Sequence, residues 1–438
     1  MTLTPLERAA VTAIERRRDE LIALLGDLIR FDTTARQTMD DPAREEAALQ
    51  RYLAARLGAA GLRTEIWEPA REDVAGHPMM APGAHFDGRP QLVASLPGSG
   101  AGRSLLFNGH IDVVSAEPRQ QWTSDPNNAV VRDGRLFGRG ACDMKGGVAS
   151  MVFAAEILAE LGAPLAGDLT VCTTTDEEFN GGGGVGAVMH GVRADAGIVT
   201  EPTIGEVWIA CRGSLIPTIT VPGRTGHAGV GQPDWRQGGA VNAVEKAVLI
   251  MDALARFRED WVIRPHQSHP HMSPGDFVPV TFDGGHWIVS YPASARLVYH
   301  IAFLPAEGGE DGMGTALARE IDQCVASAAR ADPWLAQHPP TIQWAPAVPA
   351  AQIPPDHPIV ATMLAACEAL RRPARIGAPD FWHDGATFTR FAATPCVCHG
   401  PGDVTLAHTV DESLPIDELV RCSQVLAVTA LRHCGLSD

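Results

Sequence analysis

The stretch SLLFNGHIDVV, residues 104–114, decides how this chain folds and where its chemistry lies. Its apolar residues are typical of a strand buried in a protein core, yet His110 and Asp112 stand among them, two positions apart. In an extended chain, two such side chains point to the same face. A buried charge without a partner is costly, so both residues require partners from other parts of the sequence.

The composition is that of a large, acidic globular protein. Its 438 residues exceed one ordinary core, so two or three domains are expected. The net charge of −17 argues against nucleic acid and anionic membranes as partners and fits a small-molecule substrate. No membrane-length apolar run or secretory signal is recognisable, and nine cysteines without a framework spacing indicate free thiols. We therefore predict a cytoplasmic protein.

Short apolar runs alternate with helical patterns in the first half of the chain. The runs TEIW, QLVASL, DLTVCTTT and AGIVTEP read as strands, and residues 7–29, 45–57 and 144–161 carry helical spacing. Strands that alternate with helices form a sheet buried on both faces. The fold class predicted here is α/β, with a three-layer domain around a mainly parallel central sheet.

The pattern changes after residue 211. The order of predicted elements becomes β-α-β-β-α-β, which is a compact, ferredoxin-like α+β unit. A Pro-rich stretch then returns the chain to the first domain. We predict that residues 1–211 and 348–438 form one domain and that residues 212–347 are inserted into it. The predicted elements of the insert are strands at 213–223, 276–283, 294–304 and 341–346 and helices at 238–257 and 308–331.

Four further segments place metal-type ligands at the ends of strands or glycine turns. They contain Asp143 after GRLFGRGAC, Glu177 and Glu178 at the end of a strand, Glu201 at the end of AGIVTEP, and His408 in TLAHTVDES. The carboxyl ends of parallel strands converge on one crevice, so we expect these residues to meet His110 there. Two histidines and three carboxylates suit a pair of zinc-type divalent ions bridged by one carboxylate.

The motifs HIDVV, WTSDP, GRLFGRGACDMKGG, EE, EP and AHTVDE follow one another along the chain. In this order they resemble the co-catalytic zinc family that includes acetylornithine deacetylase, succinyl-diaminopimelate desuccinylase, aminoacylase and glutamate carboxypeptidases. The resemblance implies two divalent metal ions, zinc first, with cobalt or manganese as alternatives. It also implies a role for each residue: His110 and Glu201 hold one ion, Glu178 and His408 the other, Asp143 bridges them, Asp112 orients His110, and Glu177 is the general base.

The same resemblance makes residues 212–347 a lid and dimerisation domain. His227, in GRTGHAGV, matches a lid histidine that stabilises the oxyanion and in dimeric members reaches the neighbouring subunit's site. A homodimer through the lid is therefore expected. Asn242 matches a lid asparagine that contacts substrate, and Trp382 and His383 belong to a loop that shapes the substrate pocket in relatives.

These observations predict a metal-dependent hydrolase that cleaves a linear amide bond, as an N-acyl or N-formyl deacylase. Many relatives that bind a free carboxylate carry an Arg where this chain has Ala302, and HWIVSYP with YHIAFLP resembles a branch that includes deformylases of formylated aminopyrimidines. The alternatives are a hydrolytic deaminase of an aromatic amine, a dipeptidase or carboxypeptidase, and a non-catalytic ligand-binding homologue.

One competing motif belongs to another enzyme class. Gly181, Gly183 and Gly186 form a GxGxxG, which by itself indicates a dinucleotide-binding loop. However, Asp176, Glu177 and Glu178 lie just before this motif. A bound pyrophosphate would be repelled by their negative charges. The sequence therefore favours the hydrolase over a nicotinamide oxidoreductase.

Overall fold

The computed structural model describes residues 2–437 and divides the chain into two compact units. The first unit runs to Cys211 and continues over Ala351–Pro379 and from His383 onward. The second comprises Arg212–Ala350 and Asp380–Trp382. The chain therefore re-enters the first unit three residues later than the predicted position 348, and a short segment near residue 381 belongs to the second unit.

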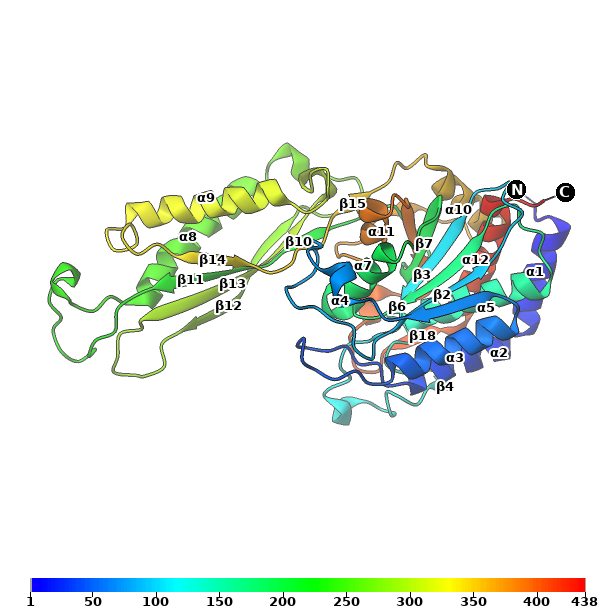
Figure 1. Ribbon diagram of the computed structural model, residues 1–438, viewed down its shortest axis with the longest axis horizontal. Helices are drawn as coiled ribbons and strands as arrows, with labels where there is room; N and C mark the ends of the chain where they lie inside the picture. Colours follow the sequence, from blue (N-terminus) through cyan, green and yellow to red (C-terminus); the bar gives the residue numbers. More distant parts are fainter. Residues whose placement is uncertain (1, 438) are drawn as a thin grey trace. The chain divides into compact units, whose positions relative to one another are not determined.

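A mixed sheet forms the centre of the first unit (Figure 1). Among the described residues its strands follow the order β1-β2-β6-β3-β7-β17-β8-β16. The neighbours β6, β3, β7 and β17 are parallel to one another, which confirms the mainly parallel sheet predicted from sequence. The strands are β1 (Arg63–Trp67), β2 (Gln91–Leu96), β3 (Leu105–His110), β6 (Leu169–Thr174), β7 (Ala196–Pro202), β8 (Val207–Trp208), β16 (Ile376–Gly377) and β17 (Cys396–Gly400).

Alternate residues of the parallel strands belong to different hydrophobic cores, one on each face of the sheet. Leu105 and Phe107 of β3 lie in the larger core, whereas Leu106 lies in the smaller one. The same alternation separates Ile198 from Val199 in β7. Successive side chains of a strand point to opposite faces, so these strands are apolar throughout because both faces are covered.

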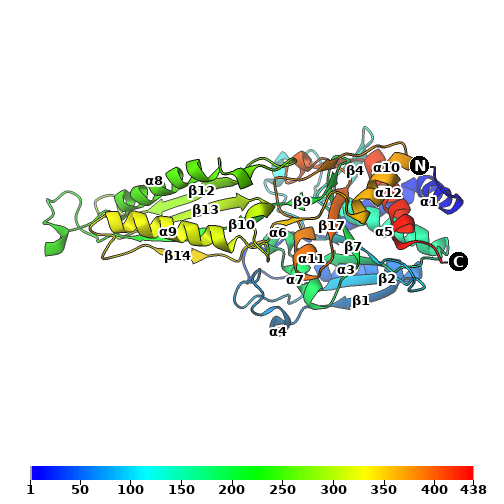
Figure 2. The same ribbon diagram turned by 90° about the horizontal axis from the view of Figure 1, so that it is seen from above.

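Helices cover both faces of this sheet (Figure 2). The helices of the larger core include α5, which is buried at every position from Lys145 to Leu158, while α7 and α11 contribute to the smaller core. The helix predicted over 7–29 is two helices that meet at Arg17. The helices are α1 (Pro5–Arg16), α2 (Arg18–Arg30), α3 (Glu46–Ala59), α4 (Arg71–Val74), α5 (Lys145–Glu160), α6 (Glu177–Asn180), α7 (Gly182–Met189), α10 (Pro358–Ala369), α11 (Gly385–Phe391) and α12 (Ile416–Cys434).

The second unit is an antiparallel sheet with two helices that pack side by side. Its strands lie in the order β12-β13-β11-β14, and β10 extends the pairing of β13. This order is the ferredoxin-like arrangement that the β-α-β-β-α-β pattern predicts. The elements are β10 (Gly213–Leu215), β11 (Pro217–Pro222), α8 (Ala243–Trp261), β12 (Asp276–Gly284), β13 (Ser294–Phe303), α9 (Thr315–Ala331) and β14 (Thr341–Trp344).

Shorter elements complete the described chain. A small sheet of β4 (Val130–Arg132), β5 (Arg135–Phe137) and β18 (Ser413–Pro415) joins the segment before Asp143 to the segment after His408. A two-stranded pair consists of β9 (Ala210–Cys211) and β15 (Ala351–Gln352). Within residues 2–437, no helix has the length and apolar character needed to cross a membrane.

Candidate metal centre

Three neighbouring parallel strands bring the predicted ligands to one edge of the sheet. His110 is the last residue of β3, and Glu201 is next to last in β7 on one side. On the other side, β6 ends at Thr174 and leads to Glu177 and Glu178. The prediction that these two glutamates end a strand is wrong: they are the first residues of the short helix α6. Consecutive helical residues still point in different directions, about 100° apart.

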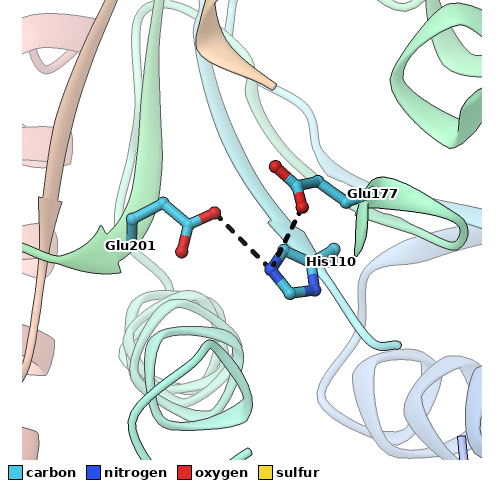
Figure 3. Close-up of side chains that lie close together, drawn as sticks. All are labelled: His110, Glu177 and Glu201. Carbon is cyan, nitrogen blue, oxygen red and sulfur yellow. Dashed lines mark ion pairs between the residues drawn. The ribbon is translucent and has the colours of Figure 1, made fainter. Parts of the chain in front are cut away.

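His110 lies at the centre of the first group of side chains (Figure 3). Its Nε2 atom is 3.2 Å from Asp143 Oδ1 and 3.5 Å from Glu201 Oε1. Glu177 Oε2 lies 3.9 Å from the same nitrogen, on the side opposite Glu201 in the view of Figure 3. All of these side chains are buried or nearly so.

His408 forms the second group with the remaining carboxylates. Its Nε2 atom is 3.3 Å from Asp143 Oδ2 and 3.2 Å from Glu178 Oε1. The two oxygens of Asp143 therefore face different histidines, which is the arrangement of a bridging carboxylate. The His408 side chain is 52% exposed, so this half of the site is the more open one. The structure brings all five predicted ligands together.

The donor atoms fit a pair of divalent ions. In two sets, His110–Glu177–Glu201 and His110–Asp143–Glu178, the ligand atoms all lie within 4.8 Å of one another. Imidazole nitrogen and carboxylate oxygen are ligands that zinc and related metals accept. Aspartate at the shared position has one oxygen for each half of the site.

The electrostatics of the cluster also call for cations. Burial raises the pKa of Glu177 and of Glu201 well above the usual value, and neighbouring carboxylates add to the effect. Burial opposes a charge on His110, but Glu201 and Glu177 hold its pKa well above its usual value. The contacts of His408 with Asp143 and Glu178 raise its pKa to about 10. The carboxylates thus outnumber the cationic groups, and bound metal ions compensate such an excess.

Asp112, predicted to orient His110, contacts the imidazole through its backbone carbonyl. The Nδ1–H of His110 donates to the backbone carbonyl of Asp112 at 2.9 Å, whereas the nearer carboxylate oxygen is 3.7 Å away. That carboxylate instead accepts hydrogen bonds from the backbone N–H groups of Glu177 and Glu178, at 3.3 and 3.1 Å. Asp112 therefore fixes the histidine through its main chain and the start of α6 through its side chain.

An arginine pair and a glutamate, which the sequence analysis did not predict, hold the segments that lead to Glu177 and to Asp143. Buried Arg36 donates to Asp176 at 2.6 Å, directly before Glu177, and Arg89 lies 3.6 Å from the other oxygen of Asp176. Glu412 accepts several hydrogen bonds from the loop that ends at Asp143. Glu412 belongs to the AHTVDE motif, so its position close to His408 in the sequence could have indicated a role at the site. Arg36 lies in no such motif.

The glycine run after Glu178 serves packing. A Cβ at Gly183 would lie 1.9 Å from the backbone oxygen of Thr175, and one at Gly184 would lie 2.3 Å from Asp384 Oδ1. Side chains are therefore excluded here by close neighbours of the protein itself. The GxGxxG pattern has a structural reason in this chain, which removes the support for a dinucleotide site.

The lid candidates His227 and Asn242 lie in the second unit. His227 is exposed, and its Nδ1 accepts from the backbone N–H of Gly229 at 3.0 Å. Asn242 is the N-cap of α8, where its side-chain oxygen accepts from Val244 N–H at 3.0 Å. Trp382 also belongs to this unit, whereas His383 belongs to the first unit and is buried, with Nδ1 accepting from Gly385 N–H.

An α/β unit with two histidines and three carboxylates gathered at the ends of parallel strands is the architecture of a dinuclear metallohydrolase. The chain matches the model of Peptidase family M20/M25/M40 over residues 106–432 and belongs to that family. This confirms the resemblance drawn from the motifs. The chain is accordingly a metal-dependent hydrolase of C–N bonds.

Individual relatives are similar over nearly the whole length. The N-formyl-4-amino-5-aminomethyl-2-methylpyrimidine deformylase of Bacillus subtilis (strain 168) is 28% identical over 441 residues, covering 96% of each chain. Human carnosine dipeptidase 1 shares the fold with a TM-score of 0.73 at 14% identity, over 98% of this chain and 99% of that one. Bacillus subtilis YxeP, described as a dinuclear metal-binding peptidase, has a TM-score of 0.62 at 16% identity, over 95% and 98%.

Proposed function

We propose that this protein is a deacylase that removes a small acyl group, formyl first, from the amino group of a heteroaromatic amine. The full-length similarity to a formyl-aminopyrimidine deformylase supports this substrate class. The lid strand supports it as well: Ala302 stands where many relatives carry an Arg for a free carboxylate, and it is buried in β13. A substrate without a carboxylate does not need that clamp.

The observation that carries the proposal is the position of Glu177 beside the two groups of ligands. Its carboxylate lies 3.9 Å from His110. Both metal positions already have their proposed ligands, however: His110 and Glu201 on one side of Asp143, and His408 and Glu178 on the other. A carboxylate in this position is free to take a proton from the attacking water and return it to the departing nitrogen. Burial raises the pKa of Glu177, and a carboxylate with a raised pKa is a stronger base.

The roles around Glu177 follow from the same geometry. Bound divalent ions polarise the amide carbonyl and lower the pKa of water. His110 and Glu201 would hold one ion, His408 and Glu178 the other, and Asp143 would bridge them. Asp112 keeps His110 in one tautomer, because its carbonyl accepts the Nδ1 proton and leaves Nε2 as the ligand atom.

The lid contributes the remaining proposed contacts. We propose that His227 stabilises the oxyanion and that Asn242, Trp382 and His383 contact substrate, as the family resemblance implies. His227 is exposed on its loop and therefore available to a reaction centre outside the lid. His383 is buried, so we propose that it meets the substrate as part of the pocket wall and does not present a polar group to it.

We further propose zinc as the metal, a homodimer formed through residues 212–347, and a cytoplasmic location. The edge strand β12 supports the dimer: within residues 2–437 it pairs with β13 alone, and Val278, Val280 and Phe282 on it are exposed. An exposed apolar edge strand is a template for pairing with another chain unless it is covered.

Nine free cysteines, eight of them buried, fit a reducing compartment.

The function is tested by product analysis on protein loaded with zinc, manganese or cobalt. We expect metal-dependent release of formate from N-formyl-4-amino-5-aminomethyl-2-methylpyrimidine, and much lower rates with N-succinyl amino acids and dipeptides. Release of ammonia from the ring amine would favour the deaminase, and preferential cleavage of dipeptides would favour the peptidase. Absence of any metal-dependent hydrolysis across these substrates would contradict the proposal. Light scattering of the same protein measures its oligomeric state.

A further inference from the structure

Glu412 is a fully buried carboxylate whose hydrogen bonds all go to one loop. Oε1 accepts from the backbone N–H groups of Cys142 and Asp143, at 2.8 and 2.9 Å. Oε2 accepts from Gly140 N–H at 3.1 Å and from the Arg139 guanidinium at 2.6 Å. Its backbone carbonyl also accepts from Gly138 N–H at 3.0 Å. One side chain thus holds the segment that ends at the bridging aspartate.

The position of Glu412 repeats that of Asp112 on the other side of the site. Asp112 follows the ligand His110 by two residues, and its carboxylate accepts from the backbone N–H groups of Glu177 and Glu178. Glu412 follows the ligand His408 by four residues, and its carboxylate accepts from the backbone of Asp143. In each case a segment that supplies a histidine also holds, by main-chain hydrogen bonds, the segment that supplies the opposing carboxylates.

We propose that Glu412 is a positioning residue for Asp143, setting the backbone from which the shared carboxylate reaches both His110 and His408. This inference rests on the proposed metal-dependent function. The physical reason lies in the number of donors: four N–H groups converge on two oxygens, and a carboxylate has an acceptor site for each. Such charge-assisted bonds are short and directional, so they fix the loop within the narrow range that two metal positions require.

A glutamine at this position has the same shape but only one acceptor oxygen. Its amide group would face two of the four donors, so at least two buried N–H groups would lose their partner. The backbone around Asp143 would then shift. Because Asp143 is shared, we expect both metal positions to weaken, and the more exposed half around His408 to lose its ion first.

The experiment compares Glu412→Gln with wild type and with Glu418→Gln as a matched control. Glu418 lies on the same stretch of chain but accepts one backbone N–H, from Gly402, and is only partly buried. Metal-free protein is titrated with Zn²⁺ in a calorimeter, and the bound zinc is counted by elemental analysis. We expect Glu412→Gln to bind the second equivalent of zinc about 10- to 100-fold more weakly and to lose kcat by a similar factor, with KM little changed. Glu418→Gln should match wild type in both measurements.

A purely structural role is separated by the melting temperatures of metal-free and zinc-loaded protein. If Glu412 only stabilises the fold, the variant melts lower in both forms and zinc raises its melting temperature as much as in wild type; that result overturns the proposal, as does unchanged zinc affinity. Glu412→Asp keeps the charge and should restore part of the zinc affinity. If neither variant yields folded protein, Glu412 is a folding determinant and the proposal is rejected. Wild type that binds two zinc ions but cleaves no amide would instead defeat the proposed function and leave the metal test intact.

Discussion

The two units of the chain show their candidate functional residues in very different states. In the first unit, the five ligands and Glu177 each lie within 4 Å of a neighbour in the cluster, and every one of these side chains except that of His408 is at most 14% exposed. The backbone N–H groups of Asp143 and Glu178 donate to two further carboxylates that are buried. In the second unit, His227 stands exposed on a loop, and Asn242 is occupied in capping a helix. The candidate residues of the first unit therefore form one cluster, whereas the contacts of His227 and Asn242 are those of a loop residue and a helix cap.

Burial decides whether the role of a candidate residue can be inferred from its surroundings. A buried cluster of ionisable groups is so costly that every member must be compensated, and a metal pair is the compensation that the donor set fits. An exposed histidine needs no partner, so its surroundings do not reveal its task. The roles of His227 and Asn242 are therefore tested by measuring activity directly.

The largest effect is expected at the two adjacent glutamates of α6. Glu177→Gln should lower kcat by about 10²- to 10⁴-fold while zinc content remains at the wild-type level, because it removes the base and no proposed ligand. Glu178→Gln should instead lose zinc. Kinetics and elemental analysis of both variants decide the matter; loss of metal from Glu177→Gln, or full activity in it, would show that the two roles are wrongly assigned.

The second effect tests whether the exposed lid histidine belongs to the reaction. If His227 stabilises the oxyanion, His227→Ala should lower kcat by about 10²- to 10³-fold, with zinc content and melting temperature unchanged. His271→Ala is the matched control, because His271 is also an exposed histidine of the second unit. Equal kcat values for the two variants would mean that His227 is an ordinary surface residue and that the first unit carries the chemistry by itself.

Much of the fold and the metal site could be predicted because both leave local signals. Continuous apolar runs indicated strands buried on two faces, and the two-fold alternation of Leu105, Leu106 and Phe107 between cores is the structural reason. The ligands could be found because the motifs that contain them resemble those of one family. Two of them, His110 and Glu201, also lie at the carboxyl ends of strands, where the topology of a parallel sheet brings side chains together.

The remainder depended on contacts without a local pattern. The carboxylate of Glu412 accepts from Asp143, 269 positions away, and Arg36 meets Asp176 across 140 positions. Arg36 lies in no motif that points to Asp176, and the AHTVDE motif places Glu412 near His408 in sequence without indicating its contact with Asp143. The assignment of Glu177 and Glu178 to a strand end failed for another reason: Asp176 adopts a left-handed conformation, with φ of 59°, which ends the strand path and begins α6.

A moderate effect of pH on stability is expected from His383, one of the buried histidines of the first unit. Burial lowers the pKa of His383 to about 4, below its model-peptide value of 6.5. As pH falls, the unfolded chain therefore binds a proton first, and stability is lost between about pH 6.5 and pH 4. Through proton linkage, this shift lowers the free energy of unfolding by about 2 kcal/mol at pH 5 relative to pH 7.

Urea unfolding of metal-free wild type and of His383→Asn at the two pH values isolates this loss as the difference between the two proteins. His383→Asn keeps an acceptor for the N–H of Gly385 but cannot titrate, so its stability should change less with pH than that of wild type. His271→Asn should retain the wild-type dependence. If His383→Asn shows the same pH dependence as wild type, His383 is more accessible to protons than its burial indicates.

The smallest effect distinguishes capping from substrate contact at Asn242. Replacing an N-cap residue by Ala costs about 1 kcal/mol, so Asn242→Ala should destabilise the second unit by that amount, whereas Asn242→Asp keeps the acceptor for Val244 N–H and the wild-type stability. The aspartate variant isolates the second role, because it retains the cap but replaces the amide NH₂ by a negative charge. An increase of KM in Asn242→Asp at unchanged stability would assign the amide to the substrate and bring the lid into the active site; unchanged KM would leave Asn242 as a helix cap. Urea unfolding and steady-state kinetics on the same preparations provide both readouts.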